Sequence, residues 1–375
     1  MNISSSSTSQ LEWSCIAPFV HSLAALAFIG WMIAGAGWHQ SLVIAIAVLI
    51  ITCPCAMGLA VPTAQVVASG ALLKRGLLVK DGSALERLAE ADIALFDKTG
   101  TLTLGQPRPE IAHLTAQQRS IALALAQTSR HPLSRGLTAT LTSQSVSPAG
   151  VTDIREVSGQ GILGEWNGQP VAIERADSPG GSLAADLRVG NHTTRIELSD
   201  HLRPDANDAL KHLDQLGLAA SILSGDHSAS VDEVGHVLGV QAKAGVSPQG
   251  KLDALEALKR QGHKPLMVGD GLNDGPALAA AHASIAPGTA SDASQQAADA
   301  VFIGEKLMPV ALAVRVARST MRVVRQNFVF AIGYNVLAIP LALFGYVTPL
   351  IAAIAMSVSS LVVVANSLRL AGEAR

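Results

Sequence analysis

The stretch "ADIALFDKTGTLTLGQP" (residues 91–107) decides the fold, because a short apolar run ends abruptly in an aspartate within a hydroxyl-rich turn. Runs of this kind are typical of buried strands. They recur as "ASILSGD", "PLMVGDGLND", "ASIAPG" and "AVFIG". Helical patterns separate several of them, at 205–216, 228–238 and 249–261. Strands that alternate with helices predict an α/β fold, with a parallel sheet and a crevice at the carboxyl ends of its strands.

Acidic residues follow these runs at the predicted strand ends, and they point to magnesium and phosphate chemistry. They are Asp97, Asp226, Asp270 and Asp274. Carboxylates that converge on one crevice repel each other unless a cation lies between them, and hard oxygen ligands suit Mg²⁺ with a phosphate. A carboxylate can also attack phosphorus and form an acyl phosphate, which is the role we predict for Asp97.

Thr99 bears on the lifetime of that acyl phosphate. An Asp-x-Asp pattern, as in related phosphatases, would place a second acid at position 99, where it could protonate a leaving group and activate water. A threonine cannot do general acid–base work near neutral pH, so the phosphorylated form is expected to persist. We expect Lys251 to neutralise phosphoryl charge and Ser224 to donate a hydrogen bond to a phosphoryl oxygen.

Charge and hydropathy divide the chain into apolar ends and a polar middle. Hydrophobic residues make up 49% of the 375 residues, charged residues make up 15%, and the net charge is −2, which gives no global support for a nucleic-acid partner. Apolar stretches at 18–38, 41–62, 327–346 and 349–368 each approach the length needed to cross a bilayer. We therefore predict two membrane hairpins that hold a polar insert at 73–326.

A signal peptide for the first stretch is disfavoured because no Lys or Arg precedes it and a second apolar run follows. Buried core helices for the last pair are disfavoured by length and the near absence of charge. Basic residues flank the insert: Lys74, Arg75, Lys80, Arg315, Arg318, Arg322 and Arg325. By the positive-inside rule, the insert and both termini are expected to face the cytoplasm.

The three cysteines, Cys15, Cys53 and Cys55, do not form a disulfide framework. Pro54 lacks a backbone N–H and breaks a helix, so Cys53 and Cys55 offer two thiolates across a break inside an apolar stretch. Soft sulfur ligands favour Cu(I) or Zn(II). We interpret Cys15 as a small apolar filler.

Together these segments resemble the heavy-metal-transporting P-type ATPases. The matching segments, in family order, are "CPCAMGLAVP", "DKTGTLT", "HPLS", "SGQG", "SGD", "MVGDGLNDGPAL", "QNFVFAIGYN" and "MSVSS". The resemblance implies membrane α-helical hairpins plus α/β domains: a haloacid-dehalogenase-like parallel sheet (the phosphorylation domain) with an inserted α+β nucleotide-binding domain. The expected boundaries are 1–15 (disordered leader), 16–72 (two transmembrane helices), 73–106 and 199–326 (phosphorylation domain), 107–198 (nucleotide-binding domain), 327–370 (two transmembrane helices) and 371–375 (tail).

The resemblance also implies roles for individual residues. Asp97 is phosphorylated with support from Lys98 and Thr99, and Ser224, Lys251 and Asn273 complete the catalytic set. Mg²⁺ is held by Asp97, Thr99, Asp270 and Asp274. ATP is bound through His131, Pro132, Gly159, Gly161, Gly225 and Asp226. Ala126 departs from the pattern, because many relatives carry a nucleotide-contacting glutamate there.

For the transported metal, the resemblance implies ligands in the later spans as well as Cys53 and Cys55. These are Tyr334, Asn335, Met356 and Ser360, with Ser359 beside Ser360 on the same helix face as Met356. A thioether is a good ligand for Cu(I), and "YN" with "MxxSS" resembles the copper subgroup, so Cu⁺ is the expected cargo. Zn(II) or Cd(II) is the alternative.

The resemblance covers only the C-terminal half of a full pump, since no actuator "TGE" loop is found. We expect a truncated copper pump in a bacterial plasma (inner) membrane, with the catalytic domains in the cytoplasm. One alternative is half of a split pump whose second chain supplies the actuator domain. The other is a membrane-tethered phosphatase or an ATP-binding regulatory module. A copper chaperone is a further expected partner.

Overall fold

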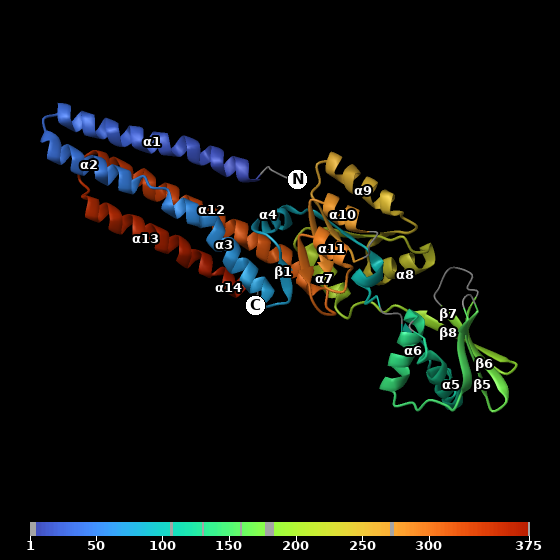
Figure 1. Cartoon of the computed structure of the whole chain (residues 1–375). Coiled ribbons are helices and arrows are strands. Elements are labelled where there is room, and N and C mark those ends of the chain that lie inside the picture. Colours follow the sequence, from blue (N-terminus) through green and yellow to red (C-terminus); the bar gives the residue numbers. More distant parts are fainter. Residues whose placement is uncertain are drawn as a thin grey trace. The chain divides into compact units, whose positions relative to one another are not determined.

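The structure is a computed structural model that describes residues 5–105, 108–129, 131–157, 160–176, 184–270 and 274–373. The chain forms two compact units, which we call the helical unit and the sheet unit (Figure 1). The helical unit contains residues 1–75, 81–89 and 315–375, and the sheet unit contains residues 76–80 and 90–314.

The helical unit is built from long apolar helices. They are α1 (Ser5–Ile33), α2 (Gly37–Ile51), α3 (Cys55–Leu73), α12 (Met308–Leu343, which begins in the sheet unit) and α13 (Pro349–Leu368), with the shorter α4 (Gly82–Glu90) and α14 (Leu370–Glu373). Among the described residues, three segments are long and apolar enough to cross a membrane: Gly37–Leu73, Met308–Leu343 and Pro349–Glu373. A shorter apolar helical segment, Val20–Ile33, accompanies them.

Helix boundaries differ from the predicted spans in two places. Helix α12 begins at Met308, well before the predicted start at 327, because no helix breaker separates the basic residues from the apolar stretch and one helix contains both. Helix α1 begins at Ser5, so most of the segment 1–15, which we predicted to be disordered, is helical. The apolar stretch 41–62 is divided between α2 and α3 around Pro54, as the missing backbone donor predicts.

Small and branched side chains from α1, α2, α12 and α13 share one buried cluster that includes Ala24, Val48, Ala342 and Ala352. Small residues let membrane helices approach closely. At the end of this cluster, the indole Nε1 of Trp31 donates a hydrogen bond to the carbonyl oxygen of Leu343 at 2.8 Å. This bond joins the end of α1 to the end of α12.

A buried side-chain amide on α12 connects this helix to α3 and α13. Asn327 of α12 is fully buried and donates to Oγ of Ser367 at 3.0 Å and to the carbonyl oxygen of Ala60 at 3.4 Å. Its Oδ1 accepts from Nδ2 of Asn366 at 2.9 Å. A buried polar group needs such partners, so the network fixes how α3, α12 and α13 pack.

The sheet unit contains a seven-stranded sheet in the order β1-β13-β12-β11-β2-β9-β10. The strands are β1 (Leu77–Val79), β2 (Ile93–Phe96), β9 (Ala219–Leu223), β10 (Gln241–Lys243), β11 (Pro265–Val268), β12 (Ala283–Pro287) and β13 (Ala300–Phe302). All neighbours are parallel except β1 and β13. Strand β2 pairs with β11 and β9, so the residue that follows β2 lies at the centre of the sheet's carboxyl edge.

Each apolar run identified in the sequence forms a strand of this sheet, which confirms the parallel α/β prediction. The helices of this domain are α7 (Ala206–Gln215), α8 (Ser228–Leu238), α9 (Pro248–Arg260), α10 (Gly275–Ala280) and α11 (Asp292–Ala297). Three of them match the predicted helical patterns to within a residue or so. Ser247 caps α9 by accepting from the backbone N–H of Gly250 at 3.0 Å, which fixes the turn that carries Lys251.

The inserted lobe is α+β, as predicted, and appears in green in Figure 1. Its six-stranded antiparallel sheet has the order β3-β8-β7-β6-β5-β4. The elements are β3 (Arg108–Pro109), α5 (Ala116–Ala126), α6 (Pro132–Ser143), β4 (Thr152–Val157), β5 (Gly161–Trp166), β6 (Gln169–Arg175), β7 (Ala184–Val189) and β8 (His192–Ser199). Its apolar core contains Leu125, Leu137, Val171 and Ile196.

Candidate catalytic and metal-binding sites

Asp97 is the first residue after β2, at the centre of the carboxyl edge of the parallel sheet. Its backbone N–H continues the pairing by donating to the carbonyl oxygen of Val268 at 2.9 Å, and the residue is only 8% exposed. The chain then turns through Gly100, whose φ is +72°, a conformation that favours glycine. The turn leaves the Asp97 carboxylate at the mouth of the sheet edge.

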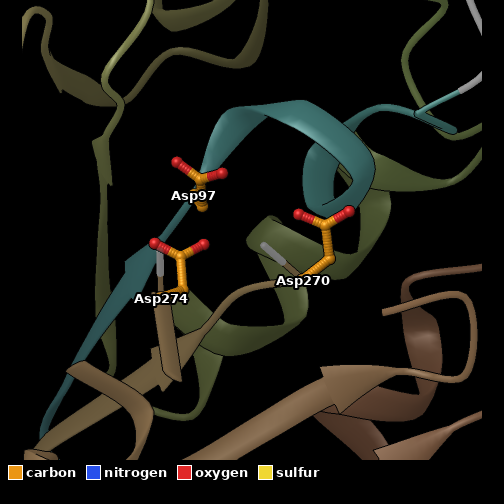
Figure 2. A group of neighbouring side chains, drawn as sticks. All are labelled: Asp97, Asp270 and Asp274. Carbon is orange, nitrogen blue, oxygen red and sulfur yellow. The ribbon is translucent and has the colours of Figure 1, made fainter. Parts of the chain in front are cut away.

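Two further carboxylates join Asp97, as the strand ends predict. Oxygen atoms of Asp97, Asp270 and Asp274 all lie within 4.8 Å of one another, and Figure 2 shows the three carboxyl groups around a shared space. Nζ of Lys251 lies 2.7 Å from Oδ1 of Asp97 and 2.6 Å from Oδ1 of Asp274. One ammonium group therefore bridges two carboxylates that come from different strand ends.

Burial and mutual repulsion set the protonation of this cluster. Burial, with a further contribution from the charge of Asp274, raises the pKa of Asp97 to about 6. Burial and the charge of Asp97 raise the pKa of Asp270 to about 7. For Lys251, burial lowers the pKa, but the carboxylates of Asp97 and Asp274 outweigh burial and the net shift is upward, so the lysine stays charged.

The cluster fits a magnesium ion. Three carboxylates supply hard oxygen ligands, and one lysine offsets only part of their charge. Glycine at position 100 leaves the room that Asp270 occupies, because a Cβ there would overlap Oδ2 of Asp270. The hydroxyl of Thr99, the fourth predicted magnesium residue, donates instead to Oδ2 of Asp226 at 2.7 Å.

Asp226, predicted to bind nucleotide, lies beside the Asp97 turn. Its Oδ2 is 2.6 Å from Nζ of Lys98, and that ammonium group also donates to Oγ of Ser230 at 2.8 Å. Burial raises the pKa of Asp226, but the bonds from Lys98 and Thr99 outweigh it and the net shift is downward. Asp226 therefore positions Lys98 and Thr99, the two residues that follow Asp97.

Ser224 and Gly225 follow directly after β9. Ser224 is buried, and its Oγ accepts from the backbone N–H of Asp226 at 3.2 Å. The hydroxyl proton of Ser224 thus remains able to point to another acceptor. Asn273, the remaining predicted catalytic residue, lies outside the described residues.

Arg203 and Asp200 were missed by the sequence analysis although both hold the turn after Asp97. The Arg203 guanidinium donates to the carbonyl oxygens of Thr101 at 2.7 Å and Gly100 at 2.9 Å, and it lies 5.1 Å from the ring centroid of Phe302. Asp200 accepts a hydrogen bond from Oγ1 of Thr103. Both residues lie about a hundred positions from the turn, so no local spacing signals their role.

The residues predicted to bind nucleotide have structural partners in the lobe. His131 is exposed and caps α6, with Nδ1 accepting from the backbone N–H of Leu133 at 3.4 Å. Pro132 is the first residue of that helix, a position that proline favours. Gly161 has a φ of +117°, and a Cβ there would overlap the carbonyl oxygen of Ile173, so the pairing of β5 with β6 requires glycine. Gly159 lies outside the described residues.

Ala126 faces the core of the lobe and is 1% exposed. It packs in the same cluster as Leu125 and Leu137. Position 126 therefore contributes packing in this chain, where the resemblance led us to consider a nucleotide contact.

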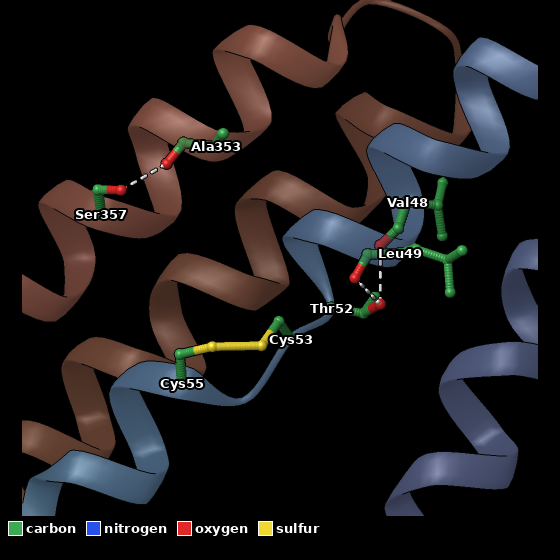
Figure 3. The surroundings of a disulfide bond; sticks show 7 residues. All are labelled: Val48, Leu49, Thr52, Cys53, Cys55, Ala353 and Ser357. Atoms are coloured by element: carbon green, nitrogen blue, oxygen red, sulfur yellow. Dashed lines mark hydrogen bonds between the residues drawn. A yellow bond between two sulfur atoms is a disulfide. The ribbon is translucent and has the colours of Figure 1, made fainter.

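A second candidate site lies in the helical unit, at the break between α2 and α3 (Figure 3). Thr52 closes α2 by donating from Oγ1 to the carbonyl oxygen of Val48 at 2.7 Å. The sulfur atoms of Cys53 and Cys55 are joined in a disulfide across Pro54, with 5.5 Å between the Cα atoms. We predicted two thiolates here, and the structure instead holds the pair in its oxidised form, so metal binding by both sulfurs requires reduction.

Beside this break lies a small, partly open cavity of about 10 Å³. It is lined by Cys53, Pro54, Ala56, Met57, Ala331, Tyr334, Asn335, Met356 and Ser359. The cavity thus unites four of the predicted transport residues. Cys55 and Ser360 do not line it, and Met57 and Ser359 do.

Two polar atoms at this site have no hydrogen-bond partner within the described part of the chain. They are the buried Oη of Tyr334 and Oδ1 of Asn335. Buried polar atoms are normally paired, so the unpaired oxygens indicate a place for a bound species.

Comparisons with known proteins agree with this geometry. The model of the haloacid dehalogenase-like hydrolases matches residues 91–282. The nitrogen fixation protein FixI of Rhizobium leguminosarum bv. viciae is 47% identical over 95% of this chain and 48% of its own length. The copper-exporting P-type ATPase of Mycobacterium tuberculosis (strain ATCC 25618 / H37Rv) is 38% identical over 95% of this chain and 50% of its own length.

Among solved structures, a zinc-transporting PIB-type ATPase in the E2.Pi state matches with a TM-score of 0.77 and 30% sequence identity. The match covers 95% of this chain and 62% of that chain. The chain spans about half the length of the curated relatives that it matches. The chain belongs to the haloacid dehalogenase-like hydrolase family and is a homologue of the PIB-type P-type ATPases.

Proposed function

We propose that the chain carries the phosphorylation and metal sites of an ATP-driven heavy-metal pump, with Asp97 as the residue that is phosphorylated. The observation that carries this proposal is the group of Asp97, Asp270 and Asp274, in which Lys251 bridges the buried carboxylates of Asp97 and Asp274 and Asp270 is half-buried. Three carboxylates and one ammonium group at a sheet edge suit a phosphoryl group and its magnesium ion. Bound Mg²⁺ would supply positive charge against the phosphate oxygens.

The reaction at Asp97 is a phosphoryl transfer. A carboxylate oxygen of Asp97 attacks the γ-phosphorus of ATP, a new O–P bond forms, and the bond from the γ-phosphorus to the β–γ bridging oxygen breaks. ADP leaves with the bond electrons. Lys251 offsets charge at the phosphoryl group, and the hydroxyl of Ser224 donates to one of its oxygens. With a pKa of about 6, Asp97 is mostly ionised at pH 7, as a nucleophile must be.

Persistence of the aspartyl phosphate follows from Thr99. Its hydroxyl donates to Asp226, and a threonine cannot serve as a general base for water. A long-lived intermediate suits a pump, because hydrolysis waits for movement elsewhere, and it disfavours the alternative of a membrane-tethered phosphatase. ATP would be held in the inserted lobe, where His131 is exposed at the start of α6 and is a candidate contact for the nucleotide.

For the cargo, we propose Cu⁺ bound at the cavity of the helical unit. Cys53 and Met356 supply soft sulfur there, and Tyr334 and Asn335 supply the unpaired oxygens. Zn(II) or Cd(II) is the second candidate, favoured by the similarity to a solved zinc-transporting ATPase. The basic residues beside the spans support a cytoplasmic insert in a bacterial plasma membrane. A copper chaperone and a chain that supplies an actuator domain are proposed partners.

Radiolabelling of membranes that contain the full chain tests this proposal. Incubation with γ-³²P-labelled ATP and Mg²⁺ is expected to give an acid-stable, hydroxylamine-sensitive label on the wild type and none on Asp97→Asn. An unchanged label on Asp97→Asn would overturn the proposal. Label that clears only when a second chain with an actuator domain is added identifies a split pump. Nucleotide binding without any label identifies a regulatory module.

A further inference from the structure

Met57 stands out in the helical unit because it brings a second thioether to the metal cavity. It lies on the first turn of α3, and Met356 lies on α13. Both line the same cavity as Cys53. We propose that Met57 is a specificity-determining ligand, which together with Cys53 and Met356 forms a three-sulfur site selective for a monovalent soft cation. This inference rests on the proposed function and deepens it.

The size of the cavity supports a single small occupant. Its volume of about 10 Å³ is close to that needed for one water-sized sphere. Three side chains from different parts of the helical unit meet there: Cys53 from the break, Met57 from α3 and Met356 from α13. A cation in this cavity would have sulfur-containing side chains on several sides.

Charge balance favours a monovalent ion. The described residues that line the cavity include no Asp, Glu, Lys or Arg, and thioethers carry no charge. Once the disulfide is reduced, Cys53 is the one thiolate on the cavity wall. A thiolate with Cu⁺ or Ag⁺ is neutral, whereas a thiolate with Zn²⁺ leaves a net positive charge that is costly away from water. Thioethers also suit Cu(I) better than Zn(II), which is bound mostly by thiolate, imidazole and carboxylate.

Ordinary packing is the competing explanation for Met57. Its side chain is half-buried against a small cluster that contains Ala56, Ala60, Ala331 and Val363. Methionine often fills such gaps. Leucine has a similar volume and no sulfur, so Met57→Leu keeps the packing and removes only the proposed ligand atom.

Equilibrium binding to the reduced full chain in detergent tests the inference. Ag⁺, a redox-stable monovalent probe, is titrated in competition with a chelator, and Zn²⁺ is titrated separately. Met57→Leu is expected to weaken Ag⁺ binding at least about tenfold, as loss of a ligand contact does, and to leave Zn²⁺ binding unchanged. Met32→Leu on α1 is the matched control, because Met32 is exposed and does not line the cavity.

Two further variants keep the outcomes distinct. Met57→Cys restores a sulfur atom and is expected to retain tighter Ag⁺ binding than Met57→Leu, and this comparison decides the matter if the leucine variant folds poorly. Equal Ag⁺ affinity in wild type, Met57→Leu and Met57→Cys would overturn the inference. If Cys53→Ser loses Ag⁺ binding and Met57→Leu keeps the wild-type affinity, the proposed function stands and the role of Met57 is rejected. Unchanged binding in Cys53→Ser would instead reject the proposed metal site.

Discussion

The ammonium group of Lys251 lies between the buried carboxylates of Asp97 and Asp274, so replacing Lys251 removes the cation that both carboxylates share. Lys251→Met leaves Asp97 and Asp274 without their shared cation, so we expect the free energy of unfolding of the sheet unit to fall by about 3 kcal/mol at pH 7.5. The loss is smaller at pH 5, where Asp97 is mostly protonated. Hydrogen exchange of the β2 and β11 amides in the full chain measures this.

Lys306→Met is the matched control for that experiment. Lys306 is exposed, so the same chemical change is expected to alter exchange by less than about 0.5 kcal/mol. Equal changes in hydrogen exchange for Lys251→Met and Lys306→Met would show that the ion pairs of Lys251 contribute nothing to the stability of the sheet unit.

Asp97 and Asp270 also give the proposed magnesium site a pH dependence. Their folded-state pKa values of about 6 and about 7 lie above the ordinary value of 3.8, so the folded chain binds protons more tightly than the unfolded chain. The stability from these groups is present below pH 3.8 and is lost as pH rises through 6 to 7. We expect Mg²⁺, when it is bound by the ionised carboxylates, to restore that stability.

Weak carboxylate sites fill at Mg²⁺ concentrations on the order of 5 mM. We therefore expect about 5 mM Mg²⁺ to raise the melting temperature of the chain more at pH 7.5 than at pH 5.5. Scanning calorimetry of the full chain in detergent checks the difference. Asp270→Asn removes one ligand and is expected to reduce the effect, whereas Asp232→Asn, at an exposed position on α8, leaves it intact. A magnesium effect that is larger at the lower pH would contradict the assignment.

Single residues differ in how well the sequence predicts them. Asp97, Asp270 and Asp274 could be predicted because each follows an apolar strand, and parallel strands end at one edge. Arg203 and Met57 could not, because their contacts depend on how distant segments pack. We predicted that Ser360 is a ligand, but Ser359 is the serine that lines the cavity. The difference reflects the rotation of α13 about its own axis, which residue spacing alone does not determine.

At the scale of elements, the interruption between α2 and α3 has a testable geometric role. In a continuous helix, residues two apart point about 200° away from each other, so Cys53 and Cys55 would diverge. Pro54→Ala removes the obstacle to helix continuation, and we expect the variant to lose the Cys53–Cys55 disulfide under mild oxidation. Thiol alkylation followed by mass spectrometry counts the free cysteines.

Pro62→Ala provides the comparison, since Pro62 lies inside α3 away from the pair. This variant is expected to form the disulfide as the wild type does. Persistence of the disulfide in Pro54→Ala would mean that the proline does not set the approach of the two sulfurs.

Strand and helix positions in the sheet unit were largely predictable because burial and periodicity agree there. The strands β2, β9, β11, β12 and β13 all fall within the apolar runs. The start of α12 was not predictable, because a helix can continue from a basic segment into an apolar one without any helix-breaking residue. The disulfide was also not predicted, since the sequence does not record the oxidation state of the cysteines.

At the scale of the whole molecule, α12 is a long helix whose residues are divided between the two units at Val314 and Arg315. If metal binding in one unit controls phosphorylation in the other, a continuous helix is a rigid means of connection. Two glycines inserted between these residues are expected to abolish the metal dependence of phosphorylation while leaving nucleotide binding and Ag⁺ binding intact. Labelling with and without metal measures this.

A matched insertion of two glycines between Gln144 and Ser145 changes a surface loop of the lobe and is expected to preserve the metal dependence. Metal dependence that survives the α12 insertion would exclude this helix as the connection. Coupling between the two units is a property that no local sequence pattern encodes.

The bond from Trp31 to Leu343 gives the molecule an intrinsic optical reporter. An indole that donates to a carbonyl in an apolar setting emits at a different wavelength from one that donates to water. Loss of the 2.8 Å bond would therefore shift the fluorescence of Trp31. In a variant that keeps Trp31 as its single tryptophan of the four, changes at the ends of α1 and α12 can be followed in this way without attaching a dye.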